Sequence, residues 1–172
     1  MDDKNQINLG IDDFAEMACK IDVYKYKNTF SKKDLFLGNE DFSQYFSIKK
    51  EIVPSIKEAI IILFLISLFD LNEWWEKNSI SPNIEWKNYL KRIWIPEHFC
   101  IKENGLIKFT KITEKYFRIN NIIGIDGNNN LINEVLLDNI NIFALENNSW
   151  NDYQYILENK NEYILFDSWT TA

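Results

Sequence analysis

The chain has 172 residues, of which 46% are hydrophobic and 15% aromatic, and its formal net charge is −7. That composition excludes an intrinsically disordered chain, because enough apolar surface is available to bury a core. The length predicts a single domain over residues 1–172, since one core typically serves about 100 to 200 residues.

The first 50 residues predict short helical elements joined by loops. Apolar residues recur at helical spacing in GIDDFAEMACKI, and Asp12 and Asp13 lie where a helix N-terminus favours anions. We therefore expect a helix from residue 12 to residue 21. SKKDLFLG runs from a candidate cap at Ser31 to Gly38 and predicts one more helical turn or two. NEDFSQYFS is interpreted as a connecting loop with buried aromatic anchors.

PSIKEAIIILFLISLFDLNEWWEKN carries the strongest local signal. Pro54 suits a first helical turn and no other breaker precedes Asn78, which predicts a helix of about 23 residues. Its apolar run is about half of what a bilayer requires, so we expect a central helix buried on nearly every side. The following Trp74/Trp75 pair is expected to pack on the core. PNIEWKNYLKRIW predicts a second, amphipathic helix closed by Pro96.

Strand signals dominate after Pro96. HFCIKENGLIKFTK predicts two short strands around Asn104-Gly105, and the alternation from Tyr116 to Trp150 predicts two or three more. The C-terminal residues predict a final hairpin with strands near residues 153–158 and 162–169. The predicted fold class is therefore α+β, with a helical N-terminal half, including a long buried central helix, packed on a C-terminal antiparallel β-sheet.

Charge is distributed unevenly along the chain. Residues 1–46 carry nine acidic and six basic residues, a net charge of −3. Residues 47–118 carry nine acidic and twelve basic residues, a net charge of +3. Residues 119–172 carry eight acidic residues and one basic residue, a net charge of −7, so the C-terminal third has a negative excess equal to that of the whole chain. An acidic C-terminal third repels phosphates, and direct nucleic-acid binding is not expected. It attracts a basic protein surface instead. The alternative is a solvated sheet face whose charge keeps the protein soluble.

The segment SWNDYQYILENKNEYILFDSW interleaves acidic and aromatic side chains and is the predicted partner-binding site. Alternate side chains of a strand face opposite ways, so one face can be core while the other displays aromatics beside carboxylates. Tryptophan and tyrosine are also enriched at binding hot spots. The residues predicted to contact a partner are Trp150, Asp152, Tyr153, Tyr155, Glu158, Glu162, Asp167 and Trp169.

No motif predicts a catalytic site, and we expect no enzymatic activity, no cofactor and no metal. His98 and Cys100 are close in sequence, but an orienting third group and an oxyanion site are not visible. One histidine and two distant cysteines are too few ligands for structural zinc. DGNNNLINEVLL lacks the glycine and the last glutamate of a calcium loop.

The segment MDDKNQINLG lacks the basic region and apolar run of a secretory signal, so we expect a cytoplasmic protein without a membrane element. In a reducing compartment, Cys19 and Cys100 are expected to be buried free thiols.

Size, acidity, the α+β pattern and the ending FDSWTTA resemble immunity proteins of bacterial polymorphic toxins, including those of contact-dependent growth inhibition. The resemblance implies an antitoxin-like role: binding and neutralising a cognate, basic, nuclease-type toxin domain. These families have unrelated folds, so the resemblance transfers no residue role. Two alternatives stay open, namely a phage or bacterial inhibitor or adaptor of another basic protein, and a small hydrolase. Self-association is not predicted either way.

Overall fold

The computed structural model describes residues 5–36, 41–76, 85–102, 105–117, 141–146 and 152–170. The strands are β1 (Gln6–Gly10), β2 (Phe30–Phe36), β3 (Asp41–Lys49), β4 (Leu106–Ile112), β5 (Asn141–Leu145), β6 (Asp152–Glu158) and β7 (Glu162–Thr170). The helices are α1 (Ile11–Lys20), α2 (Ile56–Leu71), α3 (Trp86–Tyr89) and α4 (Ile95–His98), with a 3-10 helix η1 (Val23–Tyr26) and a π-helix η2 (Leu90–Trp94).

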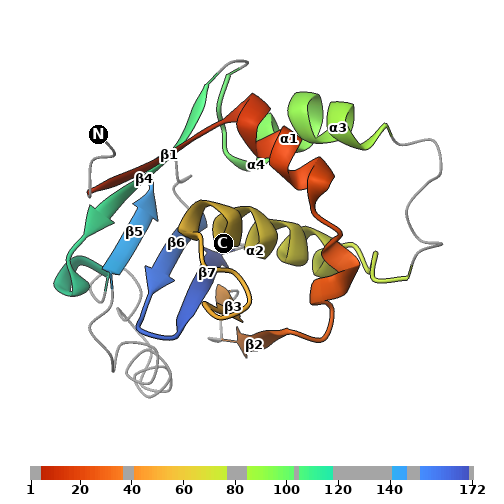
Figure 1. Ribbon diagram of the computed structural model, residues 1–172. Coiled ribbons are helices and arrows are strands. Elements are labelled where there is room, and N and C mark those ends of the chain that lie inside the picture. Colours follow the sequence, from red (N-terminus) through yellow and green to blue (C-terminus); the bar gives the residue numbers. More distant parts are fainter. Residues whose placement is uncertain are drawn as a thin grey trace.

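One seven-stranded sheet dominates the described structure, with the strand order β1-β4-β5-β6-β7-β3-β2 and every pairing antiparallel (Figure 1). The predicted fold class is therefore wrong, because the N-terminal half is not a helical layer: besides α1 and α2 it supplies β1, β2 and β3 to the dominant sheet. Both edges of the sheet come from that half, while the C-terminal hairpin of β6 and β7 lies inside the sheet.

The hairpin of β2 and β3 replaces the predicted helical turn and loop. Side chains of β3 alternate between the two faces, with Phe46 and Ile48 in the main core and Tyr45 on the opposite face. All three are buried, and so are Ser43 and Ser47 beside them. A strand covered on both faces shows little polar alternation, so its sequence did not distinguish it from a loop with buried anchors.

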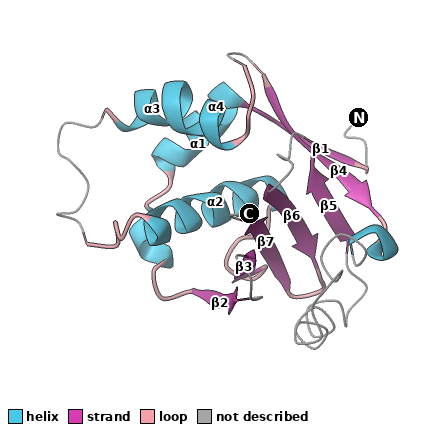
Figure 2. Cartoon of the chain, turned by 180° about the vertical axis from the view of Figure 1, so that it is seen from behind, coloured by secondary structure: helices cyan, strands magenta, loops and turns pink. Residues whose placement is uncertain are grey.

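Helix α2 forms the middle layer of the molecule, between the sheet and the group of α1, α3 and α4 (Figures 1 and 2). Every residue from Ala59 to Phe69 is buried, which confirms the predicted burial on nearly all sides. The side chain of Ser55 caps the helix by accepting a hydrogen bond from the Glu58 backbone N–H. The helix ends at Leu71 and has 16 residues, so it is shorter than predicted.

Helix α1 confirms the first predicted helix, but the second differs from its prediction. Pro96 does not close it: α3, η2 and α4 follow one another without a break to His98. The chain widens into the π-helix just before Pro96, where the Ile95 backbone N–H donates to Leu90 five residues earlier. Proline cannot donate to the Arg92 carbonyl, and the wider turn accommodates that missing bond.

The strands after Pro96 were predicted with mixed success. The final hairpin is confirmed by β6 and β7. The hairpin around Asn104-Gly105 is wrong, because His98 ends α4 and β4 pairs with β1 and β5 instead. One of the strands predicted between Tyr116 and Trp150 is β5, and residues 118–140 lie outside the described residues.

Two smaller predictions concern thiols and membranes. Cys19 and Cys100 are free but exposed, so their predicted burial is wrong. Among the residues described, no helix has the length and apolarity needed to cross a bilayer.

Candidate protein-binding surface

The C-terminal hairpin does not present one exposed acidic face. Because β7 pairs with both β6 and β3, the hairpin is central in the sheet. Its one face lies under α2, and its other face belongs to a second apolar cluster that includes Tyr155, Phe166 and Phe117. The described members of the predicted binding site are therefore divided between the core and the two ends of the hairpin.

Two predicted partner-binding residues lie in the interior. Tyr155 is 1% exposed, and its ring meets Phe117 edge-on at 4.9 Å. Asp167 is 6% exposed, on the face covered by α2, and its Oδ1 accepts a hydrogen bond of 3.4 Å from the Gln154 amide. Neither side chain is placed to contact a partner directly.

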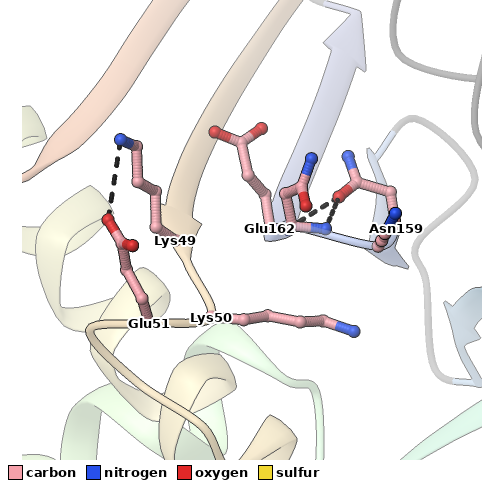
Figure 3. Close-up of a pocket in the computed structure, with 7 residues that line it drawn as sticks. Lys49, Lys50, Glu51, Asn159 and Glu162 are labelled. Atoms are coloured by element: carbon pink, nitrogen blue, oxygen red, sulfur yellow. Dashed lines mark hydrogen bonds and ion pairs between the residues drawn. The ribbon is translucent and has the colours of Figure 1, made fainter.

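Glu158 ends β6 and Glu162 begins β7, so both flank the turn of the hairpin. The turn and Glu162 line a hollow of about 640 Å³ (Figure 3). Glu158 pairs with Lys50 at 2.7 Å and is neutralised by it. Asn159 Oδ1 accepts hydrogen bonds from the Asn161 and Glu162 backbone N–H groups, which fixes the turn. The charged residues of the lining are three lysines and two glutamates, namely Lys49, Lys50, Lys160, Glu51 and Glu162. This end of the hairpin is therefore not an acidic patch.

The remaining predicted residues lie toward the other end of the hairpin. Tyr153 and Trp169 are half-buried. Asp152 begins β6, and its backbone is opposite that of Trp169. Trp150 lies outside the described residues.

The single histidine, the last residue of α4, is half-buried and belongs to a polar group with Gln154 and Asp167 of the sheet. The His98 ring stacks on Trp94 with 4.9 Å between ring centroids and meets Phe64 edge-on at 5.5 Å. Its Nε2 lies 3.0 Å from the amide nitrogen of Gln154, which can only donate, so Nε2 accepts this hydrogen bond. Burial lowers the pKa of His98 to about 4, which keeps the ring neutral at pH 7.

A combination of aromatic and acidic side chains does occur at the surface, at the C-terminal end of α2. Trp74, Trp75, Trp86 and Tyr89 are half-buried against the main core. Trp74 and Trp75 therefore pack on the core as predicted, but they also keep exposed area. We call these four residues, with the exposed Glu73 and Glu76, the aromatic–acidic surface.

Ring contacts hold the aromatic part of this surface in place. Phe69, buried near the end of α2, contacts Trp74, Trp75 and Trp86 at 5.8, 5.7 and 5.9 Å between ring centroids. Trp86 stacks on Tyr89 at 5.9 Å with an interplanar angle of 20°. Rigid, partly exposed rings of this kind can anchor a protein partner with little loss of side-chain entropy.

The end of α2 positions the two tryptophans through a Schellman turn. The Trp74 backbone N–H donates to Phe69 and that of Glu73 to Asp70, and the Trp74 and Phe69 rings make the accompanying apolar contact. Glu73 occupies the left-handed position of this turn, with φ of 56°. Glycine is preferred there, and a carboxylate near a helix C-terminus opposes the helix dipole. Glu73 is therefore unfavourable for stability in two ways.

Replacing Glu73 by glycine is expected to raise the free energy of unfolding by about 1 kcal/mol, because glycine adopts the left-handed conformation without strain. Urea denaturation followed by circular dichroism would measure the gain. Glu73→Ala is the matched control: it removes the same charge but keeps the strained backbone, so it should gain only a few tenths of a kcal/mol. Equal effects of the two substitutions would argue against backbone strain at this turn.

Charge at this end of α2 is mostly negative. No basic residue occurs in the last turn of α2, and no base among the described residues forms an ion pair with Glu73 or Glu76. Asp70 does have partners: Lys32 Nζ at 2.7 Å and the Trp75 indole N–H at 3.2 Å. Burial of the Lys32 ammonium acts to lower its pKa, but hydrogen bonds to Asp70 and Asp34 outweigh burial and raise that pKa.

Sequence reasoning missed Glu73, Glu76, Trp86 and Tyr89 as surface candidates. The usable signal was local: an acid-flanked tryptophan pair directly after a long apolar helix. A scan of protein-family models, a search of curated proteins and a search of solved structures each found no match to this chain.

Proposed function

We propose that this chain is a cytoplasmic immunity protein that binds and neutralises a cognate basic toxin domain of nuclease type. The observation that carries the proposal is the aromatic–acidic surface, in which half-buried tryptophans adjoin exposed carboxylates that no described base neutralises. The net charge of −7 supports a basic partner of any kind. The general resemblance to immunity proteins favours a toxin among such partners.

In this proposal the carboxylates set the rate of association and the aromatic rings set the rate of dissociation. Glu73 and Glu76, with the negative end of the α2 dipole, attract lysine and arginine side chains and raise the association rate. Trp74 and Trp86 lose their remaining water contact on binding and slow dissociation. A nuclease must present basic residues to its own substrate, so a carboxylate-rich surface that covers them also blocks phosphate access.

The test begins with capture of partners from a lysate of the native host at low salt, followed by elution with rising salt. The expected partner is a basic toxin domain that elutes as a stoichiometric complex and loses activity when the purified protein is added. Capture without loss of the partner's activity would instead support an inhibitor or adaptor of another basic protein. A partner that is not basic would contradict the proposal.

Charge reversal then locates the surface. Glu73→Lys with Glu76→Lys is expected to lower the association rate about tenfold or more and to weaken its salt dependence. The matched variant is Glu51→Lys with Glu162→Lys, which changes net charge equally at the hollow beside the turn of the C-terminal hairpin. Stopped-flow association at several salt concentrations measures both. If only the hairpin variant slows association, the partner binds at the hairpin and not at the end of α2.

A further inference from the structure

A second hollow lies on the sheet face opposite α2. It has a volume of about 290 Å³ and is formed over β4, β5 and β6, with part of its wall from the turn after β4. We call it the tyrosine pocket, and the lining residues that matter here are Thr110, Tyr116, Ala144, Glu146, Tyr153 and Tyr155. Two of these, Tyr153 and Tyr155, belong to the partner-binding site predicted from the sequence.

The register of the three strands explains why the surface is hollow there. Thr110, Ala144 and Tyr155 are directly opposite one another across β4, β5 and β6, so they form one row on this face. Ala144 is the small member of that row, with larger side chains on both sides. A missing side-chain volume between flanking large residues leaves a depression that the strands cannot close by moving together.

The lining of the tyrosine pocket suits a cation. Aromatic faces attract a guanidinium or ammonium group, and two tyrosines that keep exposed area, Tyr116 and Tyr153, border this hollow, while the buried Tyr155 forms its floor. The Glu146 carboxylate adds a full negative charge at the rim, where Oε1 accepts a hydrogen bond of 2.5 Å from the Thr110 hydroxyl. Lys108 is the nearest base by register, since its carbonyl accepts from the Glu146 backbone N–H. Among the described residues, however, no ion pair joins Glu146 to a base.

We propose that the tyrosine pocket binds an arginine side chain of a polypeptide. The guanidinium stacks on tyrosine while its fork of N–H donors meets the carboxylate of Glu146, which a lysine ammonium cannot do as well. Pockets that enclose a whole small ligand typically measure about 300–1,000 Å³, and this hollow of about 290 Å³ is at the small end of that range, where one side chain fits. The site is separate from the aromatic–acidic surface because it lies on the other face of the sheet, so it does not depend on the proposed function.

The experiment uses two short peptides, acetyl-Gly-Arg-Gly-amide and its citrulline counterpart, which has the same shape but no charge. Each is titrated into the full-length ¹⁵N-labelled protein, and the amide shifts of Ala144, Glu146 and Tyr153 are followed. We expect saturable shifts at these amides with the arginine peptide, and binding at least about fivefold weaker with the citrulline peptide. Glu146→Gln should reduce the difference between the two peptides.

Two further variants and one probe complete the test. Ala144→Leu fills the pocket and should abolish the shifts, while Tyr116→Ala, at a residue 55% exposed and so tolerant of substitution, should weaken binding about threefold or more without harming the fold. Equal binding of the arginine and citrulline peptides would overturn cation recognition. Absence of saturable shifts at these amides would overturn the site. Binding of free n-butylguanidinium as tight as that of the peptide would overturn a polypeptide as the source of the cation.

Discussion

Replacing Phe64 by alanine is expected to lower the free energy of unfolding by about 3–5 kcal/mol, the largest effect of any single change considered for this chain. Phe64 is fully buried in the middle layer. Its ring contacts Phe99 at 4.8 Å and His98 at 5.5 Å on the helix side, and Phe109 of the sheet at 6.2 Å. One side chain thus joins three layers, and its loss leaves a cavity that a sheet and two helices cannot collapse into.

Urea denaturation at pH 7 would measure this loss. Phe64→Leu is the control, because it keeps most of the volume and should cost clearly less than the alanine variant. A loss below about 1 kcal/mol for Phe64→Ala would mean that α2 is not enclosed by the two layers, since exposed sites tolerate such truncation.

Stability is expected to fall by about 2 kcal/mol between pH 7.5 and pH 5 because of His98 alone. The folded state holds the pKa of His98 at about 4, whereas an unfolded histidine titrates near 6.5. The unfolded chain therefore binds more protons than the folded chain in this window. The contribution is fully present above pH 6.5, and it is lost progressively as the pH falls from there toward 4.

The chain has one histidine, so the assignment can be tested with one substitution. Unfolding free energies from urea titrations at half-unit steps should show the slope in the wild type. His98→Gln has no titrating ring and should remove most of the slope above pH 5, where carboxylate titration contributes little. A flat wild-type profile would indicate that water reaches the ring in the folded state.

Local periodicity predicted three parts of this fold well. The apolar stripe of α1, the unbroken apolar run of α2 and the alternation of the final hairpin each predict their element, and each element occurs in the structure. The strand β3 was missed because its residues are covered on both faces, so the period-2 signal disappears. The predicted helix end at Pro96 was wrong for a different reason: the π-helix η2 accommodates a proline that would otherwise end the helix.

The predicted partner-binding site is not one exposed surface, because neighbouring strands and helices cover much of the C-terminal hairpin. Strand alternation correctly divides residues 162–169 into two sets, but it cannot say what covers each set. Pairing with β3, more than a hundred residues earlier, places the hairpin in the interior of the sheet. Asp167 is buried on the face under α2, and Tyr155 is buried on the other face against Phe117. The same long-range packing brought Trp86 and Tyr89 to the end of α2.

Composition and local pattern thus determined the acidic charge, the buried central helix and the C-terminal hairpin, because each depends on residues close together in the chain. Tertiary structure alone decided which aromatics remain exposed beside acids that no described base pairs with, and where a small alanine leaves a hollow in the sheet. Those properties arise where Phe69 meets Trp86 and where Ala144 lies between Thr110 and Tyr155. Contacts between residues distant in sequence depend on which apolar surfaces of the whole chain are buried against one another, and a short stretch of sequence does not contain that information.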